Sequence, residues 1–70
     1  MKPTTPVAGT RVRVLAMNDP QAVPRGTLGT VVNSTDMGKW MRIAVHWDNG
    51  SMLALAVPPD QFEVVPWRAG

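Results

Sequence analysis

The sequence predicts an all-β fold, a small barrel of five strands, and three observations lead to that prediction. Polar and apolar residues alternate from Arg11 to Val14 and from Met41 to Trp47, as they do in strands with one buried face. Asn49-Gly50 is the strongest short signal for a hairpin. Apolar residues at helical spacing do not extend over any long stretch. The chain has 70 residues, which suffice for one domain.

The first strand follows Gly9-Thr10, with Val12 and Val14 expected in the core and Arg11 and Arg13 in solvent. Prolines, an Asn-Asp-Pro run and a glycine then predict a long loop over residues 17–26.

The second strand is expected at residues 26–32, where Gly29 suggests a bulge or a sharp bend. Residues 33–39 form a polar sequence typical of a turn, with Gly38 available for positive φ.

The third strand, residues 41–47, is the clearest in the chain, and the alternation places Trp47 in the core and His46 outside. A hairpin at residues 48–50 leads into a fourth strand at 51–56, with Leu53 and Leu55 pointing inward. Pro58 and Pro59 exclude strand and α-helix, so a 3₁₀ turn is expected before a short last strand at 62–65.

The chain therefore divides into a flexible N-terminal arm (residues 1–8), a barrel (9–66) and a C-terminal tail (67–70). The N-terminal residues do not form the apolar segment of a signal peptide, and the longest apolar stretch, 52–57, is too short to span a bilayer. With no cysteine in the sequence, these features lead us to expect a soluble cytoplasmic protein.

The order of the expected elements is similar to that of SH3-like barrels, which implies that fold. Residues 9–14 followed by 26–32 also resemble the KOW motif of ribosomal and transcription-elongation proteins, with a longer loop between the two parts. That second resemblance implies binding to nucleic acid.

Over residues 9–65 the chain resembles a family of short bacterial and phage proteins of unknown function, the DUF4314 type. The resemblance implies the barrel fold and supplies no activity. The matching residues are Gly9, Arg11-Val12, Met17, Asp19-Pro20, Gly26-Thr27, Gly29-Thr30-Val31, Trp47-Asp48-Asn49-Gly50-Ser51, Leu53 and Phe62.

The residues needed for catalysis are scarce, so we expect a protein that is not an enzyme. The sequence has no Cys, no Tyr and a single histidine, His46, which lacks an evident serine partner. One histidine without cysteine does not build a zinc site, and pairing of His46 with Asp48 would still lack a third ligand. No metal and no cofactor are therefore expected.

The leading interpretation is a protein-binding module that recognises its partner through the long loop and nearby aromatic residues. Methionine offers an adaptable contact surface, and Trp40 is out of phase with the inward residues of its strand. Trp40 could equally cover an open edge of the small core. The candidate partner-binding residues are Met17, Asp19, Arg25, Met37 and Trp40.

The alternative interpretation is a nucleic-acid-binding barrel in which basic residues surround an exposed aromatic ring. Its candidate residues are Arg11, Arg13, Arg25, Lys39 and Arg42. The arginines of the first strand could instead be part of a solvated outer face, paired with Glu63 on a neighbouring strand. A third possibility is a homo-oligomer with Trp67 and the last strand at the interface.

Overall fold

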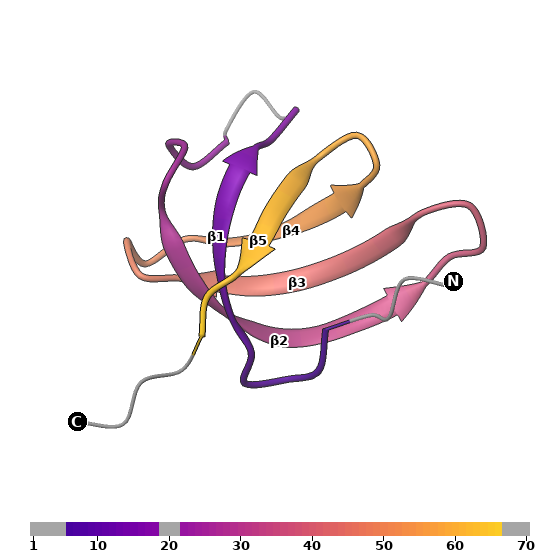
Figure 1. Cartoon of the computed structure of the whole chain (residues 1–70), viewed down its shortest axis with the longest axis horizontal. Helices are drawn as coiled ribbons and strands as arrows, with labels where there is room; N and C mark the ends of the chain where they lie inside the picture. The colour runs from indigo at the N-terminus through magenta and orange to yellow at the C-terminus, as the bar shows by residue number, and fades with distance from the viewer. Residues whose placement is uncertain (1–5, 19–21, 67–70) are drawn as a thin grey trace.

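The structure, a computed structural model, describes residues 6–18 and 22–66 as a five-stranded antiparallel sheet (Figure 1). The strands are β1 (Arg11–Ala16), β2 (Leu28–Asp36), β3 (Met41–Trp47), β4 (Met52–Val57) and β5 (Gln61–Val64). Their order across the sheet is β4-β3-β2-β1-β5, which leaves β4 and β5 at the two edges. The predicted all-β class and the five strands are confirmed.

The core lies between β1 on one side and β3 and β4 on the other, because β1 and β5 cross in front of β3 and β4 (Figure 1). The alternation along β1 and β3 places the predicted residues inside, and Trp47 is 1% exposed. The buried apolar residues are Val12, Val14, Val23, Val31, Ile43, Val45, Trp47 and Leu55. Leu53 is partly buried and packs against this core.

Strand β2 is longer than the sequence predicts, because residues 33–36 continue the strand instead of turning. The pairing with β3 shifts by one residue between Val31 and Asn33, so Val32 is the extra residue of a bulge. After the bulge the polar residues continue pairing as far as Asp36, which lies opposite Met41. A polar sequence is compatible with a strand here, because only one of its faces borders the core.

The bulge is at Val32 and not at Gly29, where the sequence suggests a bulge or a sharp bend. Gly29 instead makes room for the Trp47 side chain. It lies opposite Trp47, and a Cβ atom at this position would come within 2.6 Å of Trp47 Cε3 and of Val45 Cγ1. The absence of a side chain lets the indole ring pack directly on the β2 backbone.

The predicted hairpin between β3 and β4 is confirmed. Trp47 donates its N–H to Ser51 O at 2.9 Å and accepts from Gly50 N at 2.9 Å. Gly50 has φ +94°, a value that a residue with a side chain rarely adopts. Asn49 Oδ1 accepts from Ser51 N and completes the turn.

The turn between β4 and β5 is wider than the expected 3₁₀ turn. Asp60 donates its N–H to the carbonyl of Ala56, four residues back, at 2.9 Å. The Asp60 carboxylate is buried and accepts from Ala56 N at 2.9 Å and from Asn18 N at 2.7 Å. It therefore anchors the start of the long loop to the end of β4.

The described part of the long loop is attached to the core at its far end. Val23 is buried in the core, and Gly26 donates to Val14 O at 2.8 Å. Of the predicted arm, the structure describes residues 6–8, and Pro6 O accepts a hydrogen bond from the Ser34 hydroxyl at 2.6 Å. Within 6–18 and 22–66 no helix has the length and apolarity needed to cross a bilayer.

Candidate functional site

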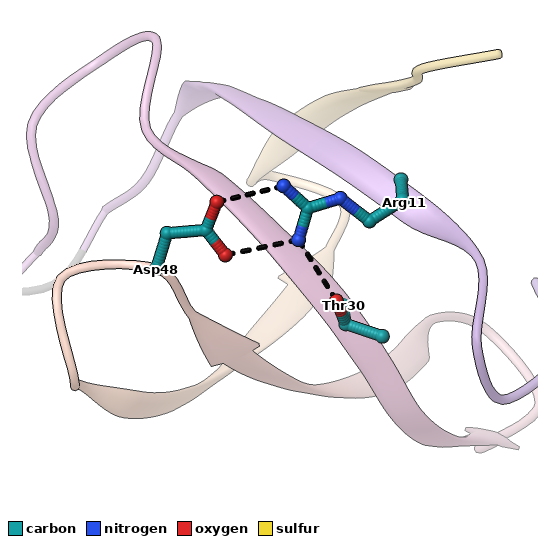
Figure 2. Close-up of polar contacts among 3 residues, drawn as sticks. All are labelled: Arg11, Thr30 and Asp48. Atoms are coloured by element: carbon teal, nitrogen blue, oxygen red, sulfur yellow. Dashed lines mark hydrogen bonds and ion pairs between the residues drawn. The ribbon is translucent and has the colours of Figure 1, made fainter. Parts of the chain in front are cut away.

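Arg11 forms the most extensive polar contact of the outer surface, and Figure 2 shows it facing Asp48 and Thr30. Its guanidinium donates to both carboxylate oxygens of Asp48, at 2.9 and 2.7 Å, and to the Thr30 hydroxyl at 2.9 Å. Thr30 lies directly opposite Arg11 on β2, and Asp48 begins the turn after β3. This bidentate arrangement connects β1, β2 and the β3–β4 turn.

The contact changes the ionisation of both partners. The hydrogen bond from Arg11 lowers the pKa of the Asp48 carboxyl, and the hydrogen bond to Asp48 raises the pKa of Arg11. Both groups are therefore charged at neutral pH, and each compensates the other. Arg11 would have to leave Asp48 before its guanidinium could contact a phosphate.

Arg13 is also paired, as one of the two interpretations of the β1 arginines predicts. Its guanidinium lies 2.9 Å from Glu63 Oε1, and Glu63 is its direct neighbour on β5. Two of the five candidate nucleic-acid residues, Arg11 and Arg13, thus already face carboxylates.

The structure does not bring the remaining basic candidates together. Arg25 lies in the turn from Pro24 to Thr27 that precedes β2, whereas Lys39 and Arg42 follow the end of β2. The nine residues of β2 rise by about 3.3 Å each, and Figure 1 shows its two ends on opposite sides of the molecule. Arg25 therefore lies at the other end of β2 from Lys39 and Arg42.

The same separation divides the candidate partner-binding residues. Arg25 is far from Met37 and Trp40, for the reason just given. Met17 is partly buried and packs against the core, so less of its side chain is available to a partner than in a fully exposed loop methionine. Asp19 lies outside the described residues, as does Trp67 of the expected oligomer interface.

What remains together is an exposed group on the β2–β3 hairpin, which we call the hairpin patch. It consists of Met37, Lys39, Trp40 and Arg42, all exposed. Met37 N donates to Trp40 O at 2.8 Å across the turn, so these two residues are neighbours. Gly38, with φ +96°, donates to Asp36 Oδ1 at 2.8 Å and fixes the turn.

The hairpin patch combines apolar and cationic side chains. Met37 is 49% exposed and Trp40 is 36% exposed. Arg42 is two residues beyond Trp40, near the start of β3, and is exposed as well. Among the described residues, the only ion pairs are those of Arg11 and Arg13, so Lys39 and Arg42 remain available to a partner.

His46 is exposed on the outer face of β3, where the alternation predicts it. The neighbouring carboxylate of Asp48 is held by Arg11. Within the described part of the chain, no three His, Cys, Asp or Glu residues are grouped as a metal site would require.

Sequence reasoning missed two residues, the buried Asp60 and the exposed Met52. Asp60 appears in the sequence as one polar residue of a turn, and only its burial against two backbone N–H groups distinguishes it. Met52 is 64% exposed on the edge strand β4, and the lack of charge in residues 52–57 was the available signal.

Comparison with known proteins gives one match. The model of a family described as a domain of unknown function, DUF4314, matches residues 4–65. No curated protein and no solved structure matches the chain. Because the match covers most of the sequence, the chain belongs to the DUF4314 family of domains of unknown function.

Proposed function

We propose that the protein is a non-enzymatic binding module that recognises another protein through the hairpin patch. The observation that carries this proposal is the exposure of Met37 and Trp40 side by side on one hairpin, next to Lys39 and Arg42. Protein interfaces are enriched in aromatic residues, methionine and arginine. An exposed indole within a polar surround is typical of an interface anchor.

The chemistry of the hairpin patch defines the partner surface that would fit it. The thioether of Met37 and the indole of Trp40 would bury an apolar side chain of the partner. Lys39 and Arg42 would face acidic groups at the rim, where charges mainly affect the association rate and the specificity. This proposal therefore places the site on the β2–β3 hairpin.

The strand order supports a finer description of the fold as an SH3-like barrel. A short first strand carrying Arg11 and Arg13, a loop and a long second strand also fit the KOW-like resemblance of the N-terminal half. The proposal also includes that this protein is cytoplasmic and of bacterial or phage origin.

The test is a capture experiment with matched variants. Tagged wild-type protein, the double variant Met37→Ala/Trp40→Ala and the control Val64→Ala are used as baits in parallel. Val64 is an exposed apolar residue of β5, away from the hairpin patch. Partners retained by the wild type and the control but lost by the double variant support the proposal. Equal retention by all three baits would refute it.

A nucleic-acid-binding barrel is the second candidate, favoured by the adjacency of Lys39, Trp40 and Arg42 on one exposed hairpin. Stacking of a base on an exposed aromatic ring contributes about 1–3 kcal/mol. This candidate predicts affinity for a single-stranded oligonucleotide that weakens steeply with salt and is lost in Trp40→Ala. Absence of binding at low salt would eliminate it.

A further inference from the structure

The edge strand β4 carries backbone groups that point away from the sheet. Trp47 N donates to Ser51 O, which identifies this pair as hydrogen-bonded across the hairpin. In an antiparallel ladder such pairs alternate with pairs whose N–H and C=O groups point outward. The outward positions of β4 are therefore Met52, Ala54 and Ala56.

Ala56 provides an independent check of this assignment. Its N–H donates to Asp60 Oδ2 at 2.9 Å, and its carbonyl accepts from Asp60 N at 2.9 Å. Asp60 thus occupies the edge at Ala56 in the way that a neighbouring strand would. Among the described residues, the corresponding groups of Met52 and Ala54 have no such partner.

Strand β4 also lacks the features that usually protect an edge. Residues 52–57 contain no charge and no proline, and the pairing with β3 runs from Met41 to His46 without a shift. The opposite edge differs, since β5 has four residues, includes the charged Glu63 and pairs with β1 through a register shift. Met52 moreover exposes 64% of its surface.

We propose that the protein forms a symmetric homodimer in which the β4 strands of two copies pair antiparallel along this edge. With Leu53 on the two-fold axis, Met52 of each copy lies opposite Ala54 of the other, and each such pair exchanges both backbone hydrogen bonds. The large Met52 side chain meets the small Ala54 side chain on the outer face.

The length of the available β4 edge matches that of the β4 strand in a second copy, which favours a second copy over an unrelated strand. The available edge ends at Ala56, where Asp60 is bound, and the strand of the second copy begins at Met52. In this register Ala56 would face Gly50 of the second copy. Gly50 belongs to the β3–β4 turn and not to the strand, so the binding of Asp60 at Ala56 costs the dimer no strand pairing. The paired segments carry no charge, so two identical copies meet without repulsion.

The dimer would place two hairpin patches on one continuous sheet, but the inference does not rest on their function. It depends only on the geometry of β4. A partner with two matching sites would bind such a dimer with an avidity above that of one patch.

The first measurement is the molecular mass in solution over a range of protein concentrations. We expect the mass to rise from one copy to two in the wild type, and Met52→Lys to weaken the association at least tenfold. Val64→Lys, which changes an exposed apolar residue on the opposite edge strand β5, should associate as the wild type does. A monomer at all concentrations, or equal association of Met52→Lys, would overturn the proposal.

Amide hydrogen exchange tests the backbone pairing itself. The amides of Met52 and Ala54 should exchange more slowly as the concentration, and with it the dimer fraction, increases. The amide of Ala56 is the internal control, because it is already bonded to Asp60 and should be unaffected. Dimerisation without slower exchange at Met52 and Ala54 would place the interface elsewhere and contradict the model of strand pairing.

Discussion

Arg11 and Asp48 are 37 residues apart in the chain, yet two hydrogen bonds join their side chains. The pair connects the beginning of β1 to the turn after β3, and Thr30 holds the same guanidinium from β2. Three segments are thus fixed relative to one another on the outer surface. Because Arg11 is engaged in this way, it contributes to the fold, whereas Lys39 and Arg42 of the hairpin patch are in neither of the ion pairs found among the described residues.

The lowered pKa of Asp48 predicts that this contact contributes less to stability in acid. The contribution is fully present above the unfolded-state pKa of about 3.9 and is lost as pH falls through the lower folded-state pKa. Denaturant unfolding should therefore show Asp48→Asn to be less stable than the wild type at pH 7. The difference should shrink as the pH falls below about 3.9, and a difference of the same size at pH 7 and in acid would contradict this explanation.

Asp60 should be more important for stability than the exposed carboxylates. Asp60→Ala leaves the N–H groups of Asn18 and Ala56 without their acceptor, which costs about 1–3 kcal/mol of unfolding free energy. Glu63→Ala is the matched control, because an exposed ion pair such as that with Arg13 contributes about 0–1 kcal/mol. Thermal and denaturant unfolding of both variants would measure the two effects, and equal losses would argue against this ranking.

At the scale of the elements, the contact between β2 and β3 requires a glycine. In Gly29→Ala the new methyl group would overlap Trp47 Cε3 and Val45 Cγ1, so we expect a loss of about 1–3 kcal/mol. The double variant Gly29→Ala/Val45→Ala should lose less than the sum of the two single changes, because Val45→Ala removes one of the two overlaps. Additive losses in denaturant unfolding would show that the overlap with Val45 does not contribute.

The sequence predicts the elements better than their ends. Alternation identifies β1 and β3 because each has one buried face, and Asn49-Gly50 identifies β4 as the hairpin partner of β3. The run from Asn33 to Asp36 consists of turn-forming residues, and only the bulge at Val32 and pairing with β3 make it a strand. Local propensity contains no information on such pairing partners.

The candidate site was less predictable, because it depends on which ends of the strands meet. Arg25 and Arg42 are both arginines, yet the length of β2 separates them. The engagement of Arg11 depends on Asp48, a contact over 37 positions that no local pattern indicates. The phase of Trp40 relative to the inward residues of β3 allowed either an exposed ring or a cover for an open edge of the core, and Trp40 is 36% exposed.

At the scale of the whole molecule, the side chains that form ion pairs and the side chains that are available to a partner lie on different elements. Arg11 and Arg13 on β1 are compensated by carboxylates, while the β2–β3 hairpin displays Met37, Lys39 and Trp40. The edge strand β4 presents a further, uncharged surface. Recognition of a partner and self-association would thus use separate parts of a single small domain.

The central claim is that the partner binds the hairpin patch, and titration of the isotope-labelled protein with the partner isolated by capture tests it most directly. Nuclear magnetic resonance spectra separate the two relevant indole N–H signals. That of Trp40 should shift, while that of Trp47, which is bonded to Leu53 O at 3.1 Å within the fold, should not. Shifts centred on Arg25 and its turn, with Trp40 unchanged, would contradict the account.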